Sequence, residues 1–595
     1  MRVKIKKLTA VLFWILLPLL GAASVLAAPA NEPPRRLSPR GLENLEAFTR
    51  LLGYVRFFHP SDQVAAADWD RVAIAGVQEA ERAVNAVDLA RTLEDFFAPL
   101  APTLRVFPDG QRPEVPAALA SPSGDPEVIY WDHRGVGLIT DDPSYFSRRS
   151  TARTRPPAET GLPLPGEPVV VSLGGGVSAM VPLTLYRDAG GTLPRVTLSA
   201  PRPDKPAGFV PSGRDRATRL AGVALAWPVL QHFYPYFDVV TADWPGELRN
   251  GLAKAAKDRN EREWVDTLRR LVVALQDGHG SVIHPARRLP YEIPLIWDWI
   301  EGQLVITHVL PRQGGGLATG DVVLTVNGRP AAQAVAAEEA LASAATPQWR
   351  RVRALRNLRR GALNETVRLR VRRINGQTIN AVLRKTVPSD SFAEARPEKI
   401  AEIQPGIFYV DLQRITDEDF RAAVNRLAGA RGIVFDLRRY PNLGLGPLRH
   451  LAASPLRSAP LRVPRVTLPD RQAFRFEDSA WTIDPSSPRL TGRIAFLTSG
   501  AAISYAETYM GIVDRYRLAE IVGGPTAGTN GNVNVIGLPG DAQIVWTGMQ
   551  VLKHDGSRHH GVGIQPTVPV SRTVRGVAEG RDEILERAIQ IVGGQ

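Results

Sequence analysis

The sequence of 595 residues is too long for a single hydrophobic core, so several domains are expected. Its 44% hydrophobic and 22% charged residues are typical of a soluble globular protein. The absence of cysteine excludes disulfides, thiolate metal sites and a lipoprotein-type cysteine anchor. The net charge of +13 is arginine-rich and spread out, and its densest cluster, residues 350–360, indicates a solvated helix face in preference to an anionic-surface site. No nucleic-acid partner is expected.

Residues 1–27 have the three parts of a secretory signal peptide. Four basic residues precede an apolar run over 8–20, and residues 25–27, Val-Leu-Ala, offer a small-residue cleavage site. A membrane anchor is the alternative, but the apolar run is short for a spanning helix, and no later stretch is long and apolar enough to cross a bilayer. We therefore expect a periplasmic or secreted protein with no integral membrane segment after the signal is removed.

Residues 40–120 and 216–289 are predicted to be two helical units related by an internal duplication. Each contains an aromatic residue shortly before a proline, followed by an Ala-Asp-Trp triplet. Phe58 and Phe233 are separated by 175 residues, and so are Trp69 and Trp244. The identical spacing indicates that the intervening loops also match in length.

Only the second unit ends in the turn 277–280, which reads Asp-Gly-His-Gly. A shared scaffold would need its core residues in both copies, so a motif in one copy alone indicates a local role. The alternative for His279 is an ordinary histidine of a surface turn.

Between the two units, residues 121–215 are rich in Pro and Gly and contain short apolar runs, which predicts a small β-rich domain without an assigned function. Residues 290–386 also predict short strands. There, Gly-Asp at 320–321 and Asn-Gly at 327–328 enclose an apolar run, a signature that resembles a PDZ domain. Such domains add a peptide as an extra strand along a groove. The alternative is a generic small β module.

Residues 387–595 alternate apolar strands with helical segments, which predicts an α/β core. In this core an apolar strand over 494–498 is followed by a Gly turn and a helix, so Ser504 falls in the first helical turn. Free N–H groups and the positive end of the helix dipole could stabilise an oxyanion there, which makes Ser504 a candidate nucleophile. The alternative is a helix-capping serine.

Four motifs follow one another in the C-terminal two thirds of the chain. They are 277–280 (Asp-Gly-His-Gly), 436–444 (Asp-Leu-Arg-Arg-Tyr-Pro-Asn-Leu-Gly), 504–507 (Ser-Tyr-Ala-Glu) and 524–532 (Gly-Pro-Thr-Ala-Gly-Thr-Asn-Gly-Asn). With the PDZ-like module between the first and the second, residues 216–595 resemble the C-terminal processing (tail-specific) and tricorn-type serine peptidases. The resemblance implies a crotonase- or ClpP-like α/β catalytic core over residues 387–595.

The resemblance also implies roles for individual residues. Ser504 matches the nucleophile, and His279 matches the general base of the tricorn-type branch. The N–H groups of Tyr505 and Gly444 match the two donors of the oxyanion hole. In tail-specific peptidases a catalytic lysine follows the Gly-x-Pro-Thr-x-Gly turn, but that position is Thr529 here, which excludes a Ser–Lys dyad at this site.

A third catalytic residue is expected to orient His279. Tricorn-type sequences carry a glutamate where His560 is nearest in register, so His560 takes this place, with Asp277 as the alternative. His554, His559 and His560 could also suggest a metal site, but a fourth ligand is missing. No metal or organic cofactor is expected.

The sequence therefore predicts an exported serine peptidase that acts on proteins or peptides, with the substrate tail engaged by the PDZ-like domain. The rival is a non-catalytic periplasmic peptide- or ligand-binding protein on the same fold, which the missing carboxylate near His560 favours. The natural substrate, the cleavage preference and the oligomeric state are not predicted.

Overall fold

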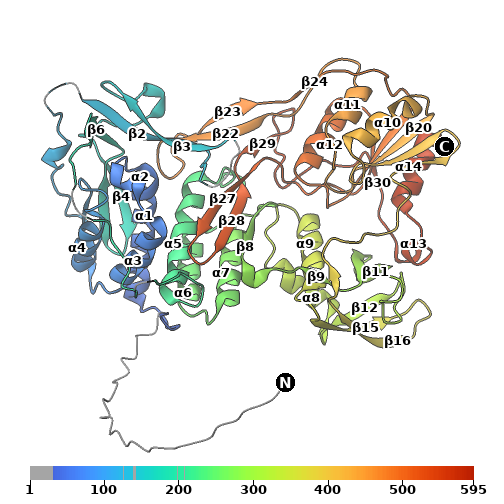
Figure 1. Ribbon diagram of the computed structural model, residues 1–595, viewed down its shortest axis with the longest axis horizontal. Coiled ribbons are helices and arrows are strands. Elements are labelled where there is room, and N and C mark those ends of the chain that lie inside the picture. Colours follow the sequence, from blue (N-terminus) through green and yellow to red (C-terminus); the bar gives the residue numbers. More distant parts are fainter. Residues whose placement is uncertain are drawn as a thin grey trace, which may run out of the picture.

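The computed structural model describes residues 31–594 except positions 123, 125, 139–142, 197–198 and 207. The predicted signal peptide, residues 1–27, lies outside the described residues. The chain folds as a mixed α/β multidomain protein, with the helical units at one end and a largely parallel sheet at the other (Figure 1). Within the described part of the chain, none of the helices has both the length and the apolar character needed to cross a membrane.

The two helical units have the same order of capped helices. Asp68 and Asn85 cap α3 and α4, and Asp243 and Asn260 cap α6 and α7. Each cap is 175 residues from its counterpart, and each side chain accepts a hydrogen bond from an N–H of the first helical turn. The helices are α1 (Pro39–Phe58), α2 (Asp62–Ala66), α3 (Trp69–Glu81) and α4 (Ala86–Phe97), then α5 (Arg216–Phe233), α6 (Trp244–Ala255) and α7 (Glu261–Val273).

Equivalent residues of the two units meet where α1 packs on α5. The rings of Phe58 and Phe233 stack with centroids 6.2 Å apart and planes 8° apart. Gly53 of α1 approaches Pro228 of α5 so closely that a Cβ on Gly53 would lie 2.5 Å from the Pro228 Cβ. Contacts between equivalent positions indicate an approximate twofold axis between the two units.

The sheet that contains most of the strands of residues 121–215 is completed by a distant part of the chain. β2 pairs with β3 and β6, and also with β22 (Leu461–Val466), where His133 lies opposite Val466. β22, β23 (Arg475–Ser479) and β29 (Gln550–Val551) therefore share this sheet, and the boundary predicted at 121–215 does not enclose it. The strands are β1 (Arg105–Pro108), β2 (Glu127–Arg134), β3 (Phe146–Ala152), β4 (Val169–Gly174), β5 (Val177–Val181), β6 (Thr184–Asp188) and β7 (Gly191–Thr192).

Residues 291–388 form two antiparallel sheets and two helices. The larger sheet has the order β10-β11-β12-β15-β16, and α9 packs on β10. In β15 buried and exposed residues alternate, as expected of a strand with one face toward a core. The elements are β9 (Tyr291–Glu292), β10 (Leu295–Ile300), β11 (Gln303–Val309), β12 (Val322–Val326), β13 (Arg329–Pro330), α8 (Ala331–Glu339), α9 (Pro347–Arg359), β14 (Arg360–Gly361), β15 (Thr366–Arg372), β16 (Thr378–Arg384) and β17 (Val387–Pro388).

The C-terminal core is a six-stranded sheet in the order β18-β19-β20-β25-β26-β30, parallel from β19 to β30. Helices α10, α11 and α12 cover one face and α14 covers the other, which buries the central strands on both sides. The elements of the sheet are β18 (Ile400–Gln404), β19 (Ile407–Asp411), β20 (Gly432–Asp436), β25 (Arg493–Thr498), β26 (Glu520–Gly523) and β30 (Val568–Pro569), with α10 (Asp417–Ala428), α11 (Gly446–Leu451), α12 (Tyr505–Arg515), α13 (Val574–Ala578) and α14 (Glu583–Gly593).

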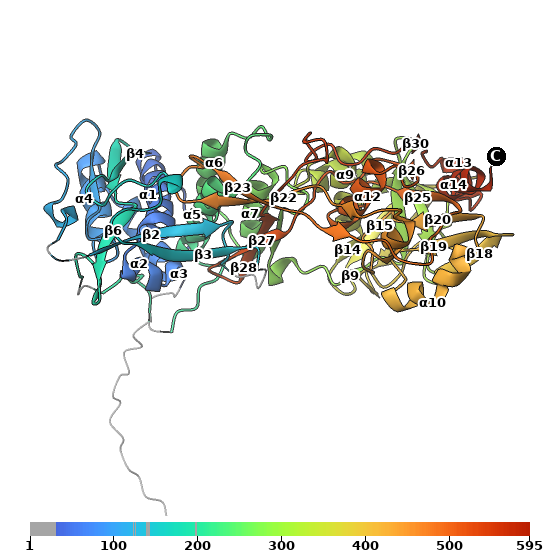
Figure 2. The same ribbon diagram turned by 90° about the horizontal axis from the view of Figure 1, so that it is seen from above.

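Two segments leave this core and run back toward the helical units (Figures 1 and 2). The first excursion contains the strands of residues 456–483, and the second excursion contains those of residues 533–551. The second excursion pairs β28 with β8 (Ser281–Ile283), which directly follows the turn 277–280. This pairing fastens the turn to the C-terminal segment. The excursions contain β21 (Leu456–Arg457), β22 (Leu461–Val466), β23 (Arg475–Ser479), β24 (Thr482–Ile483), β27 (Val533–Leu538), β28 (Ala542–Thr547) and β29 (Gln550–Val551).

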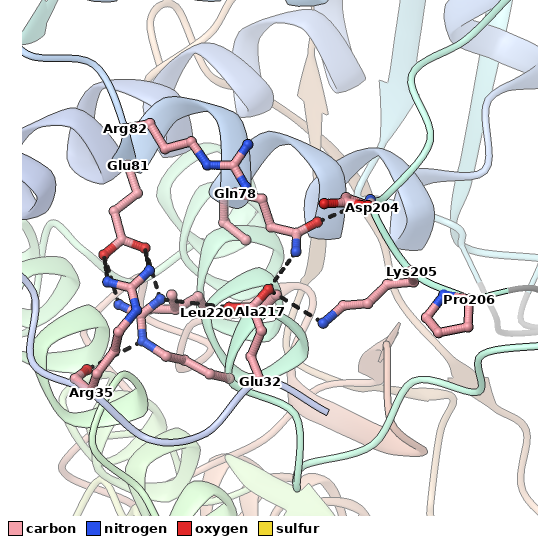
Figure 3. Close-up of a pocket in the computed structure, with 12 residues that line it drawn as sticks. Glu32, Arg35, Gln78, Glu81, Arg82, Asp204, Lys205, Pro206, Ala217 and Leu220 are labelled. Atoms are coloured by element: carbon pink, nitrogen blue, oxygen red, sulfur yellow. Dashed lines mark hydrogen bonds and ion pairs between the residues drawn. The ribbon is translucent and has the colours of Figure 1, made fainter. Parts of the chain in front are cut away.

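A charged cavity of about 620 Å³ lies where the segment beginning at residue 31 meets α3 and α5 (Figure 3). Glu81 accepts hydrogen bonds from both Arg35 and Arg216, and the Arg216 side chain is only 1% exposed. Lys205 pairs with buried Asp215 at 2.7 Å. Through these ion pairs, Arg35 of the segment that begins at residue 31 is joined to Glu81 of α3, and Glu81 is joined to Arg216 of α5.

Candidate active site

Ser504 lies at a strained turn between β25 and α12. Its φ is +61° and its ψ is −119°, a conformation that residues other than glycine rarely adopt. Its N–H donates to the carbonyl of Thr529 at 2.9 Å. Among the described residues, no main-chain N–H of α12 is capped by the Ser504 hydroxyl, so the capping role is not found. In the described structure the half-buried Ser504 hydroxyl therefore lies at the start of α12 without forming a cap hydrogen bond.

His279 is held by the end of β28. Ser281 of β8 lies opposite Val545 of β28, so the turn before β8 lies beside the residues that follow Val545. His279 Nδ1 lies 2.9 Å from Thr547 Oγ1. A strand pair formed by residues far apart in the chain therefore sets the position of the imidazole.

Thr547 connects His279 to a fully buried carboxylate. The Thr547 hydroxyl donates to Asp277 Oδ1 at 2.6 Å, and the Thr547 N–H donates to Oδ2 at 2.6 Å. Because the hydroxyl proton is used on Asp277, Thr547 Oγ1 accepts from His279, which assigns the imidazole proton to Nδ1. The lone pair is then on Nε2, the arrangement that a general base requires.

Thr529 joins the two halves of the site. Its hydroxyl accepts from the N–H of Gly278 at 3.1 Å, and its carbonyl accepts from the N–H of Ser504. Buried Glu507, three residues after the serine, accepts from the N–H of Thr529 at 2.8 Å. The residue that occupies the lysine position thus links the turn 277–280 to the turn of Ser504.

Burial keeps the imidazole of His279 neutral. Burial lowers the pKa of His279 below its usual 6.5, although the negative charges of Asp277 and Glu507 oppose this. The lowered pKa means that His279 is deprotonated at neutral pH and can accept a proton.

His560 does not take the orienting place that the sequence analysis gave it. Its Nε2 lies 3.0 Å from the carbonyl of Gln276, and its ring stacks on Tyr236 with centroids 4.1 Å apart. Burial lowers the pKa of His560 to about 4. The group on His279 Nδ1 is Thr547 instead, and the carboxylate behind it is Asp277, the alternative considered from the sequence.

The three nearby histidines point to different partners. His559 Nε2 lies 3.3 Å from Glu507, and His554 Nε2 lies 2.9 Å from the carbonyl of Arg457. Across residues 31–594 as described, no group of three or more histidine and acidic side chains is arranged to hold a metal ion. The geometry therefore offers no support for a site shared by these histidines.

The two expected oxyanion donors line one cavity of about 680 Å³. Among the described residues the N–H of Tyr505 has no acceptor, so it is available to a developing oxyanion. The N–H of Gly444 instead donates to Asp417 Oδ1 at 3.0 Å. One of the two expected donors is therefore occupied by a carboxylate of the protein itself.

The Asp-Leu-Arg motif has a structural role at the end of β20. Asp436 is buried and forms an ion pair with Arg438 at 2.6 Å, and Tyr409 donates to the same carboxylate. Burial alone would raise the pKa of Asp436, but the charges of Arg438 and Arg396 hold it well below its usual range. Ser499, which precedes α12, donates to the Arg438 carbonyl at 2.7 Å and so ties this motif to the turn of Ser504.

Helix α9 and the residues just before it contact the turn 277–280 and the loop 524–532. Arg353 Nη1 donates to the carbonyls of Gly278, Gly280 and Ser343 at 3.2, 2.8 and 2.6 Å. Thr346 donates to the carbonyl of Ala527 at 2.7 Å. The cluster 350–360 is therefore not uniformly solvated, since Arg353 holds the turn of His279.

Sequence reasoning missed Thr547, Asp417 and Arg353. Thr547 ends a strand that gave no motif, and Asp417 is one of three consecutive acidic residues at the start of a helix. The one available signal was for Arg353, which lies in the arginine-rich cluster 350–360. This cluster was predicted to be a solvated helix face.

Comparisons with known proteins bear on the fold that carries this site. Residues 406–570 match the model of Peptidase family S41. None of the curated proteins matches the chain. The structure of mature CPAF complexed with lactacystin has a TM-score of 0.52 at 14% identity and covers 64% of this chain and 99% of that chain.

The chain is also similar to two further solved structures. The CPAF s499a mutant has a TM-score of 0.53 at 14% identity, over 63% of this chain and 96% of that chain. The photosystem II D1 C-terminal processing protease has a TM-score of 0.37 at 17% identity, over 62% of this chain and 96% of that chain. At these identities the two CPAF structures establish a shared fold and nothing further.

Proposed function

Because residues 406–570 match the model of peptidase family S41, we propose that the protein is a serine peptidase with Ser504 as nucleophile and His279 as general base. The observation that carries the proposal is the chain of hydrogen bonds from Asp277 through Thr547 to His279 Nδ1, which leaves Nε2 as a base. Thr529 supports it, because this one residue bonds the turns of both proposed catalytic residues.

The proposed reaction has two stages. Ser504 Oγ adds to the peptide carbonyl carbon while its proton passes to His279 Nε2, and the oxyanion faces the N–H of Tyr505. The C–N bond then breaks, and His279 gives the proton to the leaving amine. In the second stage a water gives a proton to His279 and its oxygen adds to the acyl carbon, after which Ser504 Oγ leaves and regains a proton.

We propose that residues 291–388 act as the PDZ-like module that engages the substrate tail. Their sheet order leaves β10 and β16 as edge strands, along which an extended peptide could add. Export through residues 1–27, with removal of the signal peptide, belongs to the same proposal.

The rival function is that of a non-catalytic peptide-binding protein. The contact between Asp417 and Gly444 favours it, because a site with an occupied oxyanion donor is not arranged for catalysis. The two functions are separated by a fluorophosphonate probe followed by peptide mapping. The proposed peptidase acquires the label on Ser504, whereas a binding protein remains unlabelled.

Replacement of Thr547 by valine is expected to lower kcat by about 10²-fold, the lower end of what general-base catalysis contributes. Valine leaves His279 Nδ1 without its acceptor, so the imidazole is no longer held in the tautomer with a free Nε2. Steady-state kinetics on a fluorogenic peptide should show a fall in kcat with KM nearly unchanged. Thr547→Ser restores the hydroxyl and should recover most of the rate. Equal rates for the valine and serine variants would remove Thr547 from the mechanism.

A further inference from the structure

The cavity beside the oxyanion donors has mainly apolar walls. It lies where α10, α11 and α12 begin, and Phe420, Leu445, Trp481 and Tyr505 contribute to its lining. The rings of Trp481 and Tyr505 meet edge to face with centroids 5.8 Å apart. Trp481 remains 37% exposed, so a large aromatic surface faces solvent. This surface lies beside Tyr505, the first residue of α12, which directly follows Ser504.

Three charged side chains also line the cavity, and two of them are positive and one is negative. Asp417 bonds the N–H of Gly444, and among the described residues it has no ion-pair partner. Arg421 and Arg449 are exposed and are likewise without a recorded ion-pair partner in the described structure. A cationic side chain would be repelled by the two arginines, and an anionic one would be repelled by Asp417 close to the reacting carbonyl.

We propose that this cavity receives a bulky apolar or aromatic side chain of the residue whose carbonyl is attacked. The inference rests on the proposed peptidase function, because it takes Tyr505 and Gly444 as the groups that bind the carbonyl oxygen. A residue held there has its side chain next to the aromatic walls. The volume of about 680 Å³ is within the range of small-ligand sites and leaves a small side chain such as alanine with few contacts.

The position of Asp417 couples occupation of the cavity to catalysis. An oxyanion cannot share the N–H of Gly444 with a carboxylate, since two negative charges would compete for one donor. Asp417 is exposed, and the bond to Gly444 is the single hydrogen bond recorded for its side chain in the described structure. The charge of Asp417 also contributes to raising the pKa of Tyr505 to about 12, an effect due first to burial, which agrees with its position beside that residue.

An apolar side chain in the cavity would remove water from around Asp417 and so favour its release from Gly444. Arg421, one turn further along α10, is placed to pair with the released carboxylate. Substrates with a bulky apolar side chain therefore open the second oxyanion donor, and substrates with a small one leave it occupied. Asp417 acts in this scheme as a specificity-determining residue.

The test uses the full-length protein and peptides that differ only in the residue before the scissile bond. Phe and Leu peptides should be cleaved with kcat/KM about 10-fold or more above the Ala, Lys and Asp peptides, as expected for several buried methylenes. Trp481→Ala should reduce the Phe-to-Ala ratio toward one. Val84→Ala, at an exposed site of the first helical unit, is the matched control and should keep the wild-type ratio.

A second variant addresses Asp417 without touching the aromatic walls. Asp417→Asn should raise kcat for the Ala peptide by about 5- to 30-fold, the effect of one or two kcal/mol, and change the Phe peptide little. Equal cleavage of all the peptides, or a Phe-to-Ala ratio that survives Trp481→Ala, would overturn the inference. If Ser504 still takes the fluorophosphonate label in that case, the proposed function stands without the specificity; if it takes no label, both fall.

Discussion

Replacing Ser504 with alanine is expected to reduce peptide hydrolysis by about 10⁵- to 10⁶-fold, as when the nucleophile is removed from a working serine hydrolase. The structure gives the hydroxyl no capping role, so its removal deletes a reacting group and costs the fold little. The measurement is kcat on a fluorogenic peptide at neutral pH, together with peptide affinity by fluorescence anisotropy. Affinity should be retained, because the cavity walls are unchanged.

The matched control for this variant is Ser178→Ala, which removes a hydroxyl bonded to Asp109 far from the site in sequence and leaves the proposed nucleophile in place. It should hydrolyse the peptide at the wild-type rate. A Ser504→Ala protein that retains the wild-type rate would mean that another group is the nucleophile.

Replacing His279 with alanine is expected to have nearly the same effect as replacing Ser504, because the hydroxyl is a weak nucleophile until a base removes its proton. Nucleophile and base act as one unit, so the double variant should be little slower than either single variant. The measurement is kcat for the two single variants and the double variant. His554→Ala, which loses a surface histidine bonded to a carbonyl, is the control and should remain active.

The pH dependence of peptide hydrolysis gives a second test of His279 as the base. The base must be neutral, and burial places the pKa of His279 below its usual 6.5. Activity should therefore be constant through neutral pH and be lost only as the pH falls through that lowered value. Strictly additive effects of the two single variants would instead show that Ser504 and His279 do not cooperate.

Local patterns predicted the turn of Ser504 because its determinants are adjacent in the chain. An apolar strand, a Gly turn and a run of helix formers are enough to place a serine at a helix start. The strained backbone of Ser504 and the carbonyl of Thr529 that fixes it come from a second loop, which the sequence places nearby only through the resemblance.

The prediction that His560 orients His279 was wrong, because the residue that meets His279 is determined by the register of a strand pair. Thr547 meets His279 only because β28 pairs with β8 across more than 250 residues, and no local motif marks such a partner. The pairing of β2 with β22 could not be predicted for the same reason, and these two strands lie on opposite sides of the boundary predicted at residue 215. Long-range pairing is set by packing that periodicity does not record.

Gly444 shows a third reason why the site could not be predicted fully from the sequence. Its N–H was assigned from its place in a motif, but the donor's availability depends on a side chain from α10. The motif fixes where the backbone runs, whereas Asp417 decides whether the N–H can receive an oxyanion. Arg353 is a similar case, since burial against three carbonyls cannot be read from a cluster of basic residues.

The central claim is that an imidazole on one loop activates a hydroxyl on another, and the rate of fluorophosphonate labelling of Ser504 measures this directly. Labelling should be followed from about pH 4 to about pH 9 in the wild type and in His279→Ala. We expect the wild-type rate to rise with a single deprotonation below the usual histidine value, and the variant to label about 10²-fold more slowly or less. Equal labelling rates in the two proteins at every pH would contradict the account.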